Sequence, residues 1–161
     1  MKETEIILRR SKDSNVQAVR FDRPETALSL AVTMTLAIPV FARQRFGNWA
    51  RVLVGQINRG DYVFALDGQD PVGFCGWTPA LKVDAEKWLK QDIEIAAMSP
   101  GQADCMIVNV VIAKTPAART CLRDAVLSAT DELHYVFAKR IAADGAKRLV
   151  RLKKPQSRVR Q

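Results

Sequence analysis

The stretch NWARVLVGQINRGDYVFALDGQDPVGFCGW, residues 48–77, decides the fold. Residues 48–58 are largely apolar and predict a helix. Gly60 follows at the point where helices commonly end with a left-handed residue, a conformation that glycine adopts without steric cost. The first part of the stretch is therefore a helix with a defined end.

A β-hairpin is predicted directly after this helix. Residues 62–66 are rich in β-branched and aromatic side chains, and residues 71–77 form the returning strand. The polar residues 67–70 supply the turn chemistry between them, with Gly68 free to take a positive φ.

The rest of the chain adds helices and strands on both sides of this hairpin. Pro39 ends or kinks the helix before it by removing an amide donor, and Pro116 fits the first turn of a later helix. This mixed order predicts an α/β (α+β) domain with a single mixed twisted sheet flanked by helices. We expect helices at 24–38, 84–97 and 115–129, and strands at 5–8, 104–113, 133–139 and 147–152, the last two joined by a turn at 143–145.

Composition limits the classes of protein that this chain can belong to. Of its 161 residues, 48% are hydrophobic, which excludes global disorder, and this length can bury a core without a metal or a disulfide. The net charge is +8, and residues 139–161 contain nine Lys and Arg residues against one acid, Asp144. This basic segment either binds an anionic partner at short range or is a solvated tail without a partner.

Cysteine spacing and hydropathy indicate the compartment. The three cysteines, Cys75, Cys105 and Cys121, lack the paired spacing of a zinc site, so we expect buried free thiols in a reducing environment. Residues 1–10 are charged and unlike a signal peptide, and the apolar run 27–42 is too short to cross a bilayer. We therefore expect a cytoplasmic protein with no membrane span and no metal.

Three short motifs carry a resemblance to a known family. They are Asn48-Trp49 before an apolar helix, the hairpin from Asp61-Tyr62 to the strand PVGFCGW at 71–77, and Asp131-Glu132-Leu133 at the end of a helix. In these motifs the chain resembles the toxin-activating lysine-acyltransferases, bacterial enzymes that attach fatty acyl groups to lysines of RTX protoxins. The strand, of the form Pro-Val-x-aromatic-Cys-x-Trp, is the most specific of the three.

The resemblance implies a fold like that of the Gcn5-related N-acetyltransferases. It covers about residues 25–153, which we expect to form an acyltransferase-like domain between an N-terminal polar segment, 1–24, and a basic tail, 154–161. The phosphate-binding loop of coenzyme A users, Gln/Arg-x-x-Gly-x-Gly/Ala, is absent from the sequence. Coenzyme A as donor therefore has no support in the sequence. The resemblance implies an acylated acyl carrier protein as the donor, with no cofactor bound by this chain.

The sequence departs from the family at both catalytic positions. The family uses a His shortly before its Asn-Trp pair and an Asp in a buried strand, and this chain has Phe46 and Asn109 in those places. Neither side chain takes a proton at neutral pH. Asn48 and Asn109 are the candidate catalytic residues. Asn109 either polarises the thioester or satisfies neighbouring backbone in a structural role, and the sequence leaves both open.

The candidate substrate-binding residues are Trp49, Trp77, Cys75 and Arg51. Trp49 and Trp77 either line an apolar acyl channel or pack in the core. A packed thiol is favoured over a nucleophile for Cys75, because no partner residue lies at a diagnostic spacing. Arg51, with Arg43 and Arg45, either meets acidic groups of a carrier protein or belongs to an exposed helix face.

The expected function is transfer of a fatty acyl group from acyl carrier protein to lysine amines of an acceptor protein. One alternative is a catalytically inactive relative that binds carrier or other proteins as an adaptor. Another is a nucleic-acid-binding protein, which a sequence pI near 9.8 fits but which no recognition motif supports. A homodimer through an exposed strand edge stays open. The residues expected to bind the carrier are Arg148, Arg151, Lys153 and Lys154.

Overall fold

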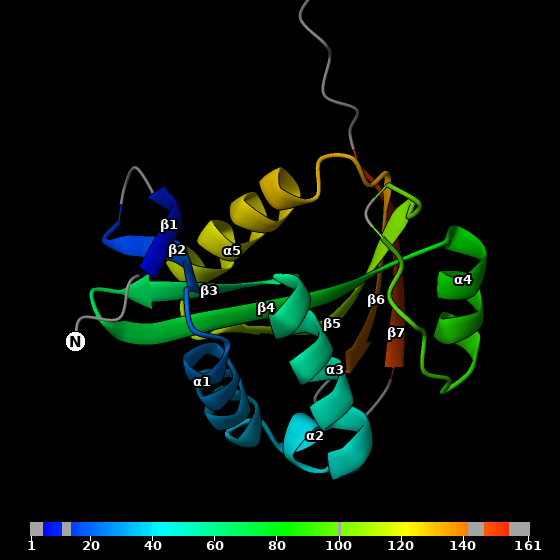
Figure 1. The fold of residues 1–161 in the computed structure, drawn as a ribbon, viewed down its shortest axis with the longest axis horizontal. Coiled ribbons are helices and arrows are strands. Elements are labelled where there is room, and N and C mark those ends of the chain that lie inside the picture. The colour runs from blue at the N-terminus through cyan, green and yellow to red at the C-terminus, as the bar shows by residue number, and fades with distance from the viewer. Residues whose placement is uncertain (1–4, 11–13, 100, 142–146, 155–161) are drawn as a thin grey trace, which may run out of the picture. The chain divides into compact units, whose positions relative to one another are not determined.

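The computed structural model describes residues 5–10, 14–99, 101–141 and 147–154. Strands and helices are mixed along the chain (Figure 1). In chain order they are β1 (Glu5–Arg10), β2 (Val16–Phe21), α1 (Pro24–Leu36), α2 (Pro39–Ala42), α3 (Phe46–Arg59), β3 (Tyr62–Asp67), β4 (Asp70–Ala80), α4 (Lys82–Lys90), β5 (Cys105–Ala113), α5 (Pro116–Ala129), β6 (Tyr135–Ile141) and β7 (Lys147–Lys153).

The fold is α+β with a mixed sheet, as predicted. The strands are neighbours in the order β1-β2-β3-β4-β5-β6-β7. The pairs β1/β2, β2/β3, β3/β4 and β6/β7 are antiparallel, whereas β5 and β6 run parallel with α5 as their connection. A parallel pair needs such a crossover, which explains why a helix separates these two strands in the sequence.

The predicted helix end and hairpin turn are both confirmed. Gly60 follows α3 with φ of 75°, and Gly68 lies in the turn with φ of 62°. Asp67 and Asp70 pair across this turn at the ends of β3 and β4. Both turns depend on glycines that reach the left-handed region at no steric cost.

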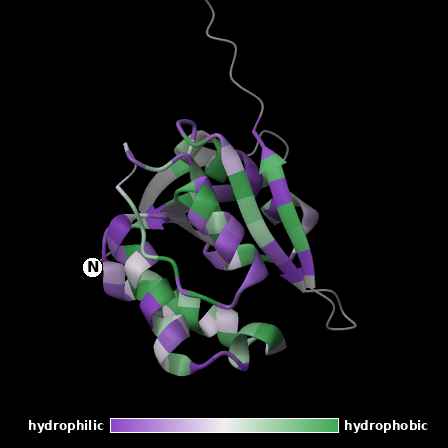
Figure 2. Cartoon of the chain, turned by 90° about the vertical axis from the view of Figure 1, so that its right-hand side faces the viewer, coloured by the Kyte–Doolittle hydropathy of each residue, from purple (hydrophilic) through white to green (hydrophobic). Residues whose placement is uncertain are grey.

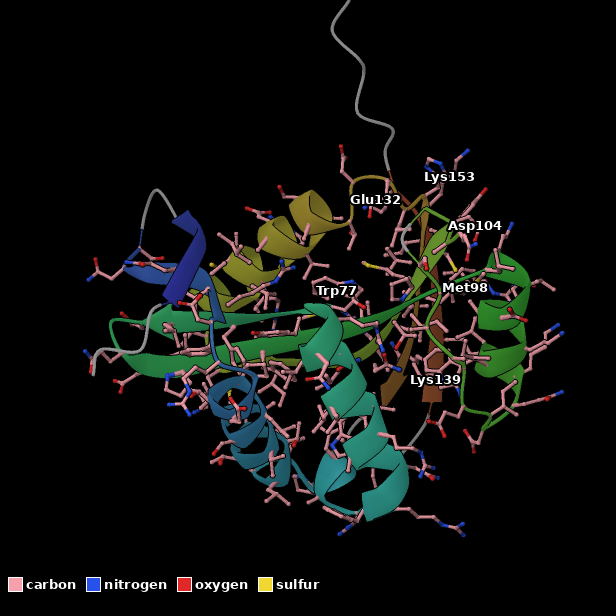
Figure 3. The ribbon with its side chains drawn as sticks, in the orientation of Figure 1. Trp77, Met98, Asp104, Glu132, Lys139 and Lys153 are labelled. Atoms are coloured by element: carbon pink, nitrogen blue, oxygen red, sulfur yellow. The ribbon has the colours of Figure 1, made fainter. Side chains whose placement is uncertain are left out.

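Several predicted boundaries were wrong. The helix expected at 84–97 is the shorter α4, and residues 92–99 are neither helix nor strand. Tertiary contacts hold this segment extended, since Lys139 Nζ donates to the Gln91 carbonyl at 3.2 Å and the Met98 amide donates to the Pro79 carbonyl at 3.0 Å (Figure 3).

Other elements were missed or misplaced by a few residues. Strand β2 was not predicted, although Val16, Ala18 and Val19 are buried. Helix α3 begins at Phe46, before Asn48, and β4 continues to Ala80. The turn expected at 143–145 and the tail beyond residue 154 lie outside the described residues.

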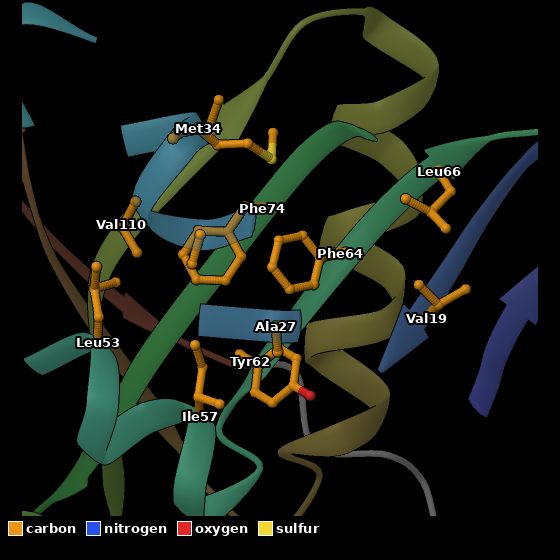
Figure 4. Packing of buried hydrophobic residues seen from close by; sticks show 12 residues of the cluster. Val19, Ala27, Met34, Leu53, Ile57, Tyr62, Phe64, Leu66, Phe74 and Val110 are labelled. Carbon is orange, nitrogen blue, oxygen red and sulfur yellow. The ribbon is translucent and has the colours of Figure 1, made fainter. Parts of the chain in front are cut away.

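The chain divides into two compact units. Unit 1 consists of Met1–Trp77 and Asn109–Ala129, and unit 2 consists of Thr78–Val108 and Thr130–Gln161. The core of unit 1 lies between α1, α3 and one face of the strands, with Phe64 and Phe74 at its centre, their ring centroids 4.7 Å apart (Figure 4). The core of unit 2 gathers buried residues of α4, β5 and β6, namely Ala80, Ala85, Leu89, Cys105, Ile107 and Phe137.

Candidate active site: an amide pair between α3 and β5

A pair of amides, the buried Gln56 and the half-buried Asn109, joins α3 to β5 within unit 1. Gln56 is 0% exposed, and its Nε2 donates to Oδ1 of Asn109 at 2.7 Å. Gln56 lies on the same face of α3 as Trp49, Leu53 and Ile57, because positions i, i+4, i+7 and i+8 share one side of a helix. The inward face of α3 therefore places the Gln56 amide next to β5, the strand that contains Asn109.

Gly76 provides the space for this amide. A Cβ at position 76 would lie 2.2 Å from Gln56 Oε1 and 3.2 Å from Val110 Cγ1. Any other residue would push the Gln56 amide away from Asn109, since heavy atoms do not approach that closely. The small residue in the family-like strand is thus explained by the amide packed against it.

Two polar atoms on this face of α3 are buried without a hydrogen-bond partner among the described residues. They are Gln56 Oε1 and Trp49 Nε1. Leaving such an atom unpaired costs about 1–3 kcal/mol. Buried polar groups of this kind are uncommon and mark sites of water, ligand or strain.

The structure separates the two candidate catalytic residues. Asn48 lies in the first turn of α3, where its Oδ1 accepts a hydrogen bond from Arg51 at 2.7 Å, and it is exposed. Gln56, which holds Asn109, follows eight residues later, a rise of about 12 Å along the helix. Asn48 and Arg51 thus belong to the helix surface, whereas the half-buried Asn109 pairs with the buried Gln56.

The two tryptophans of the predicted acyl channel lie on opposite faces of β4. Trp49 stacks on Phe41 with ring centroids 5.2 Å apart, and both pack against the core that contains Phe74. Side chains alternate along a strand, so Trp77 points to the face opposite Phe74. We therefore assign no common channel to Trp49 and Trp77.

Cys75 shares the face of Trp77, where α5 covers the strand. Gly73 marks this face, since a Cβ there would lie 2.8 Å from Leu122 of α5. Cys75 is buried, and burial raises the pKa of its thiol to about 12. A thiol that stays protonated at neutral pH is a poor nucleophile, which supports packing for Cys75.

The predicted carrier-binding residues lie on β7 in unit 2. This strand contains only basic and apolar residues, in the order KRLVRLK (Figure 2). Arg148, Arg151 and Lys153 are exposed, whereas the Lys154 ammonium donates to the carbonyl and hydroxyl of Thr130, and burial lowers its pKa. The first three are available to an anionic partner, and Lys154 anchors the strand end.

The only histidine, His134, is exposed in unit 2, where its backbone amide donates to the Asp104 carbonyl at 2.9 Å. The described part of the chain contains no cluster of His, Cys, Asp or Glu able to hold a metal. None of its described helices is long and apolar enough to span a bilayer.

Gln56 is the residue that sequence reasoning missed. A signal for it exists: Gln56 occupies the inward stripe of an amphipathic helix, three residues after Leu53, where an apolar residue is expected. A polar residue at such a position requires a buried partner.

No family model matches the chain, and no curated protein matches it.

Proposed function

We propose that this chain is a protein-lysine acyltransferase of the toxin-activating type, which takes a fatty acyl group from acyl carrier protein. The Gln56–Asn109 pair carries the proposal. Asn109 lies in the strand where the resembled family has its catalytic carboxylate, and the hydrogen bond from Gln56 fixes the orientation of the Asn109 amide. The proposed fold relationship is to the Gcn5-related N-acetyltransferases, and the proposed compartment is the cytoplasm.

Asn109 acts as the polarising group in this proposal. Its amide NH₂ donates to the thioester oxygen as that oxygen gains charge, and one such donor is worth about 10²–10³-fold in rate. The lysine nitrogen forms a bond to the acyl carbon and loses its proton to water. The carbon–sulfur bond breaks, and the carrier thiolate takes a proton from water.

The missing base sets the expected rate. A positioned general base contributes about 10²–10⁴-fold, and Phe46 and Asn109 cannot supply it. Positioning of two reactants is worth an effective concentration of about 10⁵–10⁸ M in favourable cases. The proposed enzyme keeps positioning and polarisation, so it is slower than a relative with His and Asp but faster than free solution.

The carrier docks on β7 in this proposal. Arg148, Arg151 and Lys153 are exposed and attract the acidic surface of an acyl carrier protein over about 8 Å at physiological salt. The acceptor is a protein with accessible lysines.

Intact-mass analysis tests the proposal. The purified chain is mixed with carriers that bear different acyl chains and with lysine-containing acceptor proteins. We expect acyl mass increments on the acceptor and loss of thioester above the rate without the chain. Equal rates with and without the chain contradict it.

A second candidate, an adaptor that binds the acylated carrier without turnover, is favoured by one specific observation. Phe46, in the place of the family histidine, is 85% exposed and has no acid–base chemistry. Saturable binding of the acylated carrier with an intact thioester supports the adaptor and excludes the enzyme.

A further inference from the structure

One end of unit 1 combines exposed apolar side chains with arginines. We call it the α2 shoulder, residues 36–48, which links the end of α1 to the start of α3 (Figure 1). Leu36 is 63% exposed and Phe46 is 85% exposed, and α2 itself contains no buried residue. Large apolar groups are thus presented to solvent where the chain turns between two helices.

The charge around the α2 shoulder has one sign. Residues 26–60 contain no Asp or Glu, and Arg43, Arg45 and Arg51 are exposed within this range. The acid-free range ends at Asp61, which pairs with Arg59 at 2.7 Å. The shoulder is therefore basic as well as apolar.

This combination fits the interface of an anionic membrane. Aromatic and aliphatic side chains enter the boundary between headgroups and acyl chains, while arginines next to them contact lipid phosphates. A lipid surface adapts to isolated protruding side chains, whereas a protein partner needs a matching shape. We propose that the α2 shoulder docks this protein peripherally on anionic phospholipid. The inference is independent of the acyl-transfer activity.

Vesicle co-sedimentation of the full chain tests the inference. We expect binding to vesicles of phosphatidylcholine with phosphatidylglycerol, and much weaker binding to phosphatidylcholine alone. Phe46→Ser is expected to lower the partition coefficient about tenfold, since it removes one inserted apolar side chain. Arg43→Gln with Arg45→Gln is expected to lower it by about 25-fold, from roughly fivefold for each charge near the surface.

Matched controls separate the shoulder from the net charge of the chain. Arg148→Gln with Arg151→Gln removes the same charge from β7, and Val83→Ser removes an apolar side chain that is 58% exposed on α4. Both controls are expected to keep most of the binding. All these positions are exposed, so the variants are expected to fold, which circular dichroism checks.

Three results would overturn the inference. The first is absence of vesicle binding by the unchanged chain. The second is a β7 variant that weakens binding as much as the shoulder variant does. The third is a Phe46→Ser variant that loses carrier-protein binding but keeps vesicle binding, which would assign the shoulder to the carrier. Quenching of Phe46→Trp fluorescence by brominated lipid is the positive sign of insertion.

Discussion

At the scale of single residues, the contact between Gly76 and Gln56 determines whether the Gln56 amide can reach Asn109. Gly76→Ala places a Cβ where Gln56 Oε1 lies, 2.2 Å away, so the buried amide must move and its bond to Asn109 is strained or lost. We expect Gly76→Ala to lower the free energy of unfolding by about 1–3 kcal/mol. In a Gln56→Ala background the same change is expected to cost much less, because only the 3.2 Å contact with Val110 Cγ1 remains. Urea unfolding of the unchanged protein, the two single variants and the double variant measures this difference.

Gly73→Ala is the control for this double-mutant cycle of Gly76 and Gln56. A Cβ at position 73 would lie 3.1 Å from the Ile112 carbonyl and would contact Leu122 on the other face of β4. Gln56→Ala is therefore not expected to lower the cost of Gly73→Ala. Equal costs of Gly76→Ala with and without Gln56 would show that the amide is not what fills the space at residue 76.

The cysteines give a second prediction at this scale. Burial raises the pKa of Cys75 and Cys105 to about 12, and Cys121 is buried as well. At pH 8, a thiol with a pKa of about 12 is ionised in only about 1 in 10,000 molecules. We expect a disulfide reagent to leave the native thiols unmodified and to react with all of them after unfolding. Prompt modification of Cys75 in the native protein would indicate a reactive thiol and would contradict a packing role for Cys75.

Local chemistry was predictable from the residues themselves. Gly60 and Gly68 take positive φ as predicted, because the conformation depends on the residue and its immediate neighbours. The Gln56–Asn109 contact was not predicted, because its partners lie far apart in the sequence. The sequence around Asn109 indicated that its amide needs a hydrogen-bond partner. It did not indicate which helix would supply that partner.

At the scale of elements, Tyr62 joins the start of β3 to the end of β2. Its hydroxyl accepts from the Phe21 amide and donates to the Phe21 carbonyl, both at 3.2 Å. Tyr62→Phe is expected to cost about 1 kcal/mol of unfolding free energy at neutral pH, because these bonds are lost.

The same contact gives a pH dependence. Burial raises the pKa of Tyr62 above 10, so the folded state disfavours the phenolate. Below pH 10 the phenol is neutral in both states, and above it the unfolded chain ionises first. The unchanged protein should therefore lose stability relative to Tyr62→Phe as pH rises from about 10. Parallel stability curves for the two proteins would contradict the burial of this phenol.

The elements also show where sequence patterns fail. Residues 84–97 have helical composition, yet α4 ends at Lys90, since Lys139 and the backbone of Pro79 bind the chain beyond it. Strand β2 was not predicted, because polar residues surround its three buried residues, Val16, Ala18 and Val19, in the sequence. In both cases tertiary contacts outweigh local preference, which contributes only fractions of a kcal/mol per residue.

At the scale of the whole molecule, the order of helices and strands predicted the α+β class and the mixed sheet. The basic character of β7 was also predictable from the sequence, because it depends on the residue types alone and not on tertiary contacts. What could not be predicted is which candidate residues meet. Asn48 lies about two turns of α3 away from Gln56, the residue that bonds to Asn109, and Trp49 and Trp77 lie on opposite faces of β4. Only the packing of α3 against β4 and β5 reveals the amide pair.

The most direct measurement is the rate of acyl transfer from an acylated carrier to lysine amines, by intact mass, with the unchanged chain and with Asn109→Ala. We expect transfer above the uncatalysed rate for the unchanged chain and a loss of about 10²–10³-fold for Asn109→Ala, whose polarising amide is gone. Equal rates for the two proteins, or no transfer by either, would contradict the proposed activity.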